Sequence, residues 1–198
     1  MTAQDAITEH NTTGLILAGG AGRRVEGRDK GLILWRNKTL VAHTVERIRP
    51  QVATLLISCN RNFDRYRAYA DTLVADSRRD FQGPLAGLEA ASPLIDTEFV
   101  FVCACDTPEL PLDMVTRLAE PLNQANRRTI GISYAHDGTR DQYLCAVIRR
   151  SCLPSLPDYL DSGQRAVHKW FASQHCMAID FSDAAGSFGN FNQGPQLA

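Results

Sequence analysis

The chain has 198 residues, of which 44% are hydrophobic, and this suits one globular domain with a substantial core. Its formal net charge of −1 at pH 7 excludes the basic excess of a protein whose main partner is nucleic acid. No apolar run reaches the length of a membrane span, and residues 1–12 are polar and unlike a signal peptide, so we expect a cytoplasmic protein without a membrane partner. We expect residues 1–12 to form a flexible tail and residues 13–198 to form a single domain.

Segments typical of strands alternate with segments typical of helices, which predicts an α/β fold with a mostly parallel sheet and helices on its faces. In chain order we expect a strand at 14–17, a helix at 39–49, a strand at 54–59, a short helix within 60–69, a strand at 73–75, a turn and helix within 83–95, a strand at 99–105, a helix at 112–122 broken near Pro121, and strands at 129–134 and 144–148. The order of the strands in the sheet is not predicted.

A glycine-rich loop follows the first expected strand. Residues 17–24 read LAGGAGRR, and three glycines in four positions let backbone N–H groups approach a ligand closely. The eight residues 23–30 hold four cations: Arg23, Arg24, Arg28 and Lys30. We therefore predict a phosphate-binding loop suited to a nucleoside triphosphate. The alternative is a glycine-rich turn whose arginines are only solvated.

Two common nucleotide-binding loops do not match this segment. Arg28 and Asp29 stand where a P-loop needs Lys and then Ser or Thr. Val25 stands where a Rossmann loop needs its third glycine. The loop therefore belongs to another class.

Asp106 follows the most apolar expected strand, 99–105. Ligands of open α/β sheets bind beyond the carboxyl ends of the strands, so Asp106 is expected to face the phosphates held by the glycine loop. A carboxylate in that place can bind Mg²⁺. The alternative is an aspartate that caps the turn before Pro108.

The six cysteines form no Cys-x-x-Cys pair, and four lie in apolar runs. We expect reduced, buried thiols. Cys103 and Cys105 would share one strand face, but no nearby histidine or second thiol pair completes a four-ligand metal site.

Four blocks in this order resemble the molybdenum cofactor guanylyltransferases, a family of nucleotidyltransferases. They are residues 17–20 with 29–32, residues 76–77 with 83–88, residues 105–108, and residues 180–181 with 188–192. The resemblance implies a three-layer α/β/α Rossmann-like nucleotidyltransferase fold with a mostly parallel central sheet. It also implies transfer of GMP from Mg-GTP to the terminal phosphate of molybdenum-molybdopterin, with release of pyrophosphate and formation of the guanine dinucleotide cofactor.

The resemblance also implies roles for individual residues. Contacts with GTP fall to Leu17, Ala18, Gly19, Gly20, Lys30, Asp76 and Asp106, with Asp76 at the nucleoside. Lys30, Arg24 and Asp106 are the implied catalytic residues, and Asp106 is also the implied ligand of Mg²⁺. Asn190 and Asn192 alternate on an expected final strand and are assigned to the acceptor side, with turn asparagines as the alternative. An enzyme that supplies molybdopterin and proteins that mature molybdoenzymes are the implied protein partners.

Several residues depart from the family pattern. Glu26 places a carboxylate in the phosphate loop, and Ser58 stands where some relatives have an asparagine, with Asn60 as a candidate substitute on the same strand face. On the side expected to receive the pterin, Gln142-Tyr143 replaces His-Pro, and Gln193-Gly194 replaces Thr-Pro.

Two other functions stay open on the sequence alone. One is an enzyme of the same fold that uses CTP, or a sugar or alditol phosphate as acceptor. The other is a carrier that binds a nucleotide or the cofactor without transferring anything.

Overall fold

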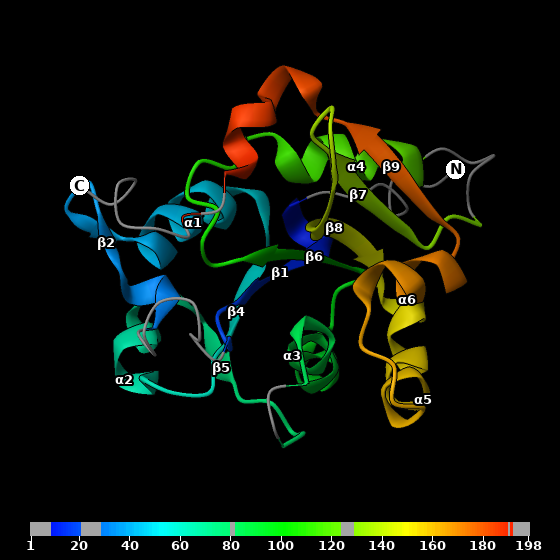
Figure 1. Cartoon of the computed structure of the whole chain (residues 1–198), viewed down its shortest axis with the longest axis horizontal. Coiled ribbons are helices and arrows are strands. Elements are labelled where there is room, and N and C mark those ends of the chain that lie inside the picture. Colours follow the sequence, from blue (N-terminus) through cyan, green and yellow to red (C-terminus); the bar gives the residue numbers. More distant parts are fainter. Residues whose placement is uncertain (1–8, 21–28, 80–81, 124–128, 190, 192–198) are drawn as a thin grey trace.

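The computed structural model describes residues 9–20, 29–79, 82–123, 129–189 and 191 (Figure 1). A seven-stranded sheet in the order β5-β4-β1-β6-β8-β7-β9 lies at its centre. The strands are β1 (Thr12–Leu17), β4 (Thr54–Ser58), β5 (Thr72–Val74), β6 (Phe99–Ala104), β7 (Ile132–His136), β8 (Asp141–Arg149) and β9 (Cys176–Asp180). All pairs are parallel except those that β8 makes with β6 and β7. The predicted mostly parallel sheet is confirmed.

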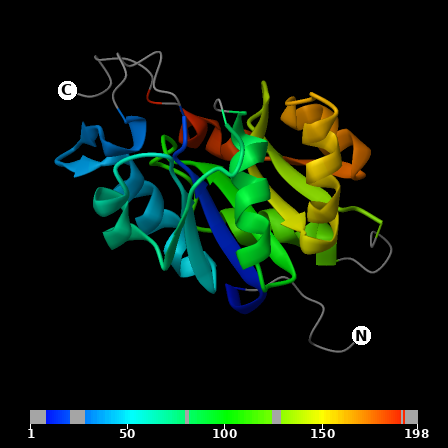
Figure 2. The ribbon, with the colours of Figure 1, turned by 90° about the horizontal axis from the view of Figure 1, so that it is seen from below.

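Helices cover both faces of this sheet (Figures 1 and 2). On one face lie α1 (Leu40–Ile48), α2 (Phe63–Tyr66) and α4 (Met114–Asn123); on the other lie α3 (Pro84–Ala91), α5 (Leu156–Asp161) and α6 (Val167–Ser173). Neighbouring residues of β1 show the two faces: Ile16 packs in the core under α1 and α4, and Leu15 in the core under α3, α5 and α6. The fold is therefore the expected three-layer α/β/α arrangement.

Local sequence explains where α1 begins and ends. The side chain of Thr39 accepts a hydrogen bond from the backbone N–H of Ala42 at 3.3 Å, which caps the helix. Leu40, Val41 and Ile48 are buried on one side of it. Pro50 follows and cannot continue the helix, so the expected helix at 39–49 is confirmed.

The expected break of the helix at Pro121 is wrong, because α4 runs through this residue to Asn123. Pro121 lies in the last turn, where its missing N–H costs only one helical hydrogen bond near an end that frays in any case. Leu118 and Leu122 are buried in the core on either side of Pro121. Their packing outweighs the local cost of the proline.

Two strand features were not expected. A small hairpin pairs β2 (Leu34–Trp35) with β3 (Lys38–Thr39), and its turn residues Arg36 and Asn37 have positive φ values of 46° and 64°. The edge strand β9 also forms beside β7. In addition, β7 spans 132–136 rather than the expected 129–134.

The first described elements lie near the expected boundary between tail and domain at residue 12. A 3₁₀ turn covers Glu9–Asn11, and β1 starts at the buried Thr12. Thr12 and Thr13 pair with Phe99 and Val100 of β6. Within the described ranges, no helix is long and apolar enough to cross a membrane.

Candidate functional site

The carboxyl ends of β1, β4 and β6 lie side by side and form the floor of the candidate site. The N–H of Ala18 donates to the carbonyl of Ser58 at 2.8 Å, and the N–H of Cys105 donates to the carbonyl of Leu17 at 3.1 Å. These bonds continue the sheet beyond β1, so that Gly19 and Gly20 leave it at its edge. Such an edge is where open α/β sheets bind ligands.

The two glycines differ in their surroundings. A Cβ on Gly19 would lie 3.0 Å from Nδ2 of Asn60, whereas a Cβ on Gly20 would meet nothing within 4 Å. Gly19 therefore allows a close approach of backbone and side chain inside the protein, while Gly20 is open to solvent. Arg24, the other cation expected in catalysis, and Glu26 lie outside the described residues.

Lys30 and Asp106 form an ion pair beside this loop, although 76 positions separate them in the chain. Lys30 opens the short 3₁₀ helix Lys30–Leu32, and Asp106 follows β6 directly. Their side chains are 24% and 10% exposed. Lys30 pairs with Oδ2 of Asp106, and Oδ1 has no hydrogen-bond partner among the described residues. In that part of the chain every fully buried side-chain oxygen has a partner, so Oδ1 must be in contact with solvent. One carboxylate oxygen thus remains open to a ligand.

A hydrogen-bond network around Asp29, which is buried at Tyr66 and exposed at Asn62, fixes the backbone that precedes Lys30. Oδ2 of Asp29 accepts from Nδ2 of Asn62 at 2.9 Å, and Oδ1 accepts from the hydroxyl of Tyr66. Tyr66 is fully buried, and burial is the main cause that raises the pKa of its phenol, so it stays a donor. Gly31 leaves room for this hydroxyl, because a Cβ there would lie 2.5 Å from it. Neither Asn62 nor Tyr66 was expected at the site from the sequence.

Tyr66→Phe is expected to lower the free energy of unfolding by about 1–3 kcal/mol, because the Asp29 carboxylate loses a buried donor. Urea unfolding measures the change. Tyr69→Phe is the matched control, since Tyr69 is only half-buried and its hydroxyl accepts a 3.2 Å bond from Thr39. Equal unfolding midpoints for Tyr66→Phe and the wild-type chain would contradict the role given to this hydroxyl.

Asp76 follows β5 at the same edge of the sheet and is bound to the loop after β4. Its N–H donates to Oδ1 of Asn60 at 2.9 Å, and its carboxylate accepts from Nδ2 of Asn60 at 2.8 Å. The hydroxyl of Ser58 makes a longer bond of 3.4 Å to the other carboxylate oxygen. Since β4 ends at Ser58, Asn60 lies in the loop and not on the strand face where it was expected.

The C-terminal block, residues 180–181 with 188–192, contacts Asp106. The N–H of Phe191 donates to the carbonyl of Asp106 at 3.4 Å, and the Phe191 ring lies 4.7 Å from the ring of Trp35. Asn190 and Asn192 lie outside the described residues, as does most of the expected final strand; Phe191 itself has no regular secondary structure.

Gln142 and Tyr143, two of the departures from the family pattern, lie at the same edge of the sheet. They stand at the start of β8, which runs antiparallel to β6, so this start lies near the end of β6. The amide of Gln142 donates to Asp137 at 2.6 Å, and the hydroxyl of Tyr143 donates to Asp141 at 2.7 Å. The hydrogen bond from the Thr139 side chain is the main cause that lowers the pKa of Asp137. Gln142 thus helps to fix the β7–β8 turn.

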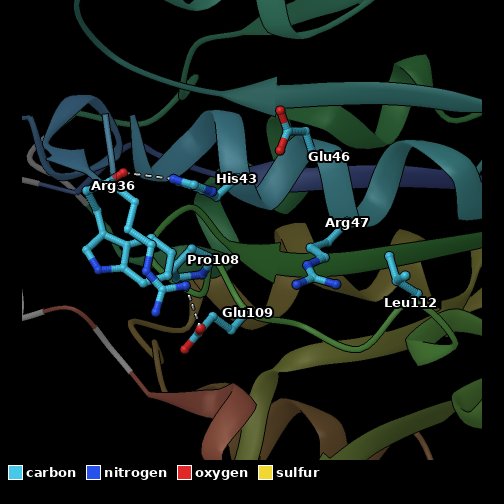
Figure 3. A pocket seen from close by; sticks show the side chains of 8 residues that line it. Arg36, His43, Glu46, Arg47, Pro108, Glu109 and Leu112 are labelled. Carbon is cyan, nitrogen blue, oxygen red and sulfur yellow. Dashed lines mark hydrogen bonds and ion pairs between the residues drawn. The ribbon is translucent and has the colours of Figure 1, made fainter. Parts of the chain in front are cut away.

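A separate pocket of about 280 Å³ lies between α1, the β2–β3 hairpin and the segment after Asp106 (Figure 3). Its lining is Trp35, Arg36, His43, Glu46, Arg47, Pro108, Glu109 and Leu112. Arg36 pairs with Glu109 at 3.5 Å, and Nε2 of His43 lies 2.9 Å from the carbonyl oxygen of Trp35. Within the described part of the chain, the lining of this pocket contains none of the residues expected to bind GTP.

The six cysteines are free thiols, and all but the half-buried Cys176 are buried. Burial is the main cause that raises the pKa of Cys59 to about 11 and of Cys145 to about 12. Among the described residues no three His, Cys, Asp or Glu side chains are grouped as a metal cluster. The structure therefore agrees with the expectation of thiols that pack in the core.

Comparisons with known proteins agree on one family. The model of the MobA-like NTP transferase domain matches residues 14–177. A molybdenum cofactor guanylyltransferase of Shewanella halifaxensis is 37% identical over 193 residues, which are 97% of this chain and 91% of the relative. Another protein of that name, from Shewanella pealeana, is 37% identical over 178 residues, covering 90% of this chain and 88% of the relative.

Solved structures share the fold at low sequence identity. Molybdopterin-guanine dinucleotide biosynthesis protein A of Archaeoglobus fulgidus has a TM-score of 0.73 and 18% identity, over 94% of each chain. The 4-diphosphocytidyl-2C-methyl-D-erythritol synthase of Anaerococcus prevotii has a TM-score of 0.69 and 9% identity, over 94% of this chain and 92% of that one. At such identities these structures establish the fold alone.

Proposed function

We infer the reaction from family membership: this chain belongs to the MobA-like NTP transferase family. It is a nucleotidyltransferase, and its relatives by sequence are molybdenum cofactor guanylyltransferases. We propose that it transfers GMP from GTP to the terminal phosphate of molybdenum-molybdopterin and so forms the guanine dinucleotide cofactor. The observation that carries this function is the Lys30–Asp106 ion pair, which lies beside the glycine loop at the carboxyl ends of β1 and β6.

The nucleotide is proposed to lie along the end of β1. Backbone groups of Leu17, Ala18, Gly19 and Gly20 contact GTP in this proposal, since they leave the sheet at its ligand-binding edge. Asp76 is proposed to accept hydrogen bonds from the nucleoside. Its carboxylate has room for this role, because an ionised carboxyl group offers about four acceptor positions and Asn60 and Ser58 each use one.

The reaction joins two polyanions. An oxygen of the acceptor phosphate attacks the α-phosphorus of GTP, the bond from that phosphorus to the bridging oxygen breaks, and pyrophosphate leaves with the bond electrons. The protein mainly aligns the groups and supplies positive charge, without a covalent nucleophile. We assign this charge to Lys30, together with Arg24.

The open carboxylate oxygen of Asp106 fits Mg²⁺, which binds proteins through one or two carboxylates and keeps waters and phosphate oxygens as its other ligands. Bound there, the ion supplies charge neutralisation at the reacting phosphates. Asp106 also pairs with the Lys30 ammonium, so that this carboxylate would hold both the lysine and the metal ion.

The acceptor is proposed to lie on the side of the C-terminal block. Phe191 is bonded to Asp106, and this bond supports a role for the flanking Asn190 and Asn192 toward the acceptor. We also propose an enzyme that supplies molybdopterin and molybdoenzyme-maturation proteins as transient partners. The six free thiols suit a reducing compartment, and we propose the cytoplasm.

Transfer of label from α-labelled GTP or CTP into molybdenum-molybdopterin tests this function. We expect transfer from GTP with Mg²⁺ and none when a chelator removes the metal. Transfer from CTP alone would overturn the choice of base. Intact GTP binding without transfer, with an acceptor that is active in a control enzyme, would favour a carrier or a different acceptor phosphate.

A further inference from the structure

We propose that Asn60 is a positioning residue that holds the two nucleotide-binding elements of this site in register, an inference that rests on the proposed function. One element is the glycine loop after β1, and the other is Asp76 after β5. The two are not neighbours in the sheet, because β4 lies between their strands. The side chain of Asn60, in the loop after β4, bonds to both.

The amide of Asn60 uses both of its ends. Oδ1 accepts from the N–H of Asp76 at 2.9 Å, and Nδ2 donates to Oδ2 of Asp76 at 2.8 Å and to the carbonyl of Gly19 at 3.3 Å. This pattern fixes the orientation of the amide, since a flipped side chain would place two acceptors together at the Asp76 carboxylate. A group that both donates and accepts is required here.

The close packing of Gly19 supports the same role. A Cβ on Gly19 would lie 3.0 Å from Nδ2 of Asn60, a contact tighter than side chains normally make. The glycine thus lets the loop backbone reach the amide. The backbone at Ala18 and Gly19 is placed by this contact as well as by the bond from Ala18 to Ser58.

Ser58 cannot take over this function. Its hydroxyl bonds to Asp76 at 3.4 Å, and a Cβ on Gly87 of α3 would lie only 2.6 Å from that hydroxyl. The hydroxyl is therefore packed against α3, and within the described part of the chain it forms no hydrogen bond with Gly19. Asn60 alone, among the described side chains, bonds to both Asp76 and the carbonyl of Gly19.

The rest of this loop bonds to a third part of the site. Nε of Arg61 lies 3.7 Å from Oδ2 of Asp29, and Nδ2 of Asn62 donates to the same oxygen at 2.9 Å. Asp29 precedes Lys30. Residues 60–62 thus contact the glycine loop, the nucleoside carboxylate and the segment that carries the phosphate-binding lysine.

Asn60→Asp tests the proposal with little change of volume. It removes the donor to Gly19 and Asp76 and places a carboxylate against that of Asp76. We expect the Kd for GTP, measured by calorimetry without acceptor, to rise about tenfold or more. We also expect KM for GTP to rise more than kcat falls, because the nucleoside contacts act in the ground state as well as in the transition state. Asn37→Asp is the control, an exposed asparagine in the β2–β3 turn with positive φ.

A double-variant cycle distinguishes positioning from a general loss of structure. If Asn60 acts largely through Asp76, the effect of Asn60→Asp on GTP affinity shrinks in an Asp76→Ala background. Asn60→Ala and Asn60→Ser provide the same comparison if Asn60→Asp does not fold, as judged by thermal unfolding. A folded Asn60 variant with wild-type affinity would overturn the inference. Wild-type protein that binds GTP but does not transfer GMP would instead overturn the proposed function, and the affinity comparison would still apply.

Discussion

Asp106→Ala is expected to lower the rate of GMP transfer at least about a hundredfold while the chain still folds, because it removes a main electrostatic element of the site. The carboxylate holds the Lys30 ammonium and leaves one oxygen open toward the ligand side. The backbone carbonyl of Asp106, which accepts from Phe191, is not altered by the substitution. Steady-state kinetics with GTP and molybdenum-molybdopterin measure the loss as kcat/KM.

Two further variants sharpen this result. Asp106→Asn keeps the size of the side chain and removes its charge, so a loss of similar size would assign the effect to charge. Asp158→Ala removes an exposed carboxylate in the first turn of α5 and should leave the rate unchanged. Wild-type turnover in both Asp106 variants would exclude this residue from the mechanism.

Much of the fold was predictable because the central strands are short apolar runs between clear helix and turn signals. Residues 99–105 and 54–59 read as buried strands, and β6 and β4 are these strands. The order of the sheet was not predictable, because it depends on pairing between residues far apart in sequence. The edge strand β9 was not predicted for a related reason, because it is half-exposed and forms through its pairing with β7. At Pro121 the sequence predicted a break in the helix, but packing of Leu118 and Leu122 in the core outweighs the cost of the proline.

The candidate site was predictable where a residue carries a local signal: Asp106 follows an apolar strand directly, and Lys30 follows the glycine-rich loop. Asp106 and Lys30 were both expected at the ligand-binding edge, and the structure brings them into contact. Asn60 was named only as a substitute for another side chain, and Tyr66 was missed. Their bonds join segments 16 to 41 positions apart, so no local pattern shows them. The polar run Asn60-Arg61-Asn62 directly after a buried strand was the available signal.

Lys30→Met is expected to lower kcat/KM for transfer at least about a hundredfold, because it removes the one described cation that pairs with Asp106 at the site. A unit charge about 4 Å from a phosphate oxygen is worth roughly 4 kcal/mol at an effective dielectric constant near 20, before desolvation costs. Methionine keeps most of the length and the apolar stem of lysine. Lys38→Met is the matched control, since Lys38 is exposed and pairs with Glu46 away from the site.

The double variant Lys30→Met with Asp106→Asn tests whether these residues act as one unit. Each single substitution removes a charge and also leaves its partner unpaired in a site that is mostly buried. The combined loss in kcat/KM should therefore be clearly smaller than the product of the two single losses. Losses that multiply would mean that Lys30 and Asp106 stabilise the reacting phosphates independently, and that their ion pair serves only to hold them in place before the substrate binds.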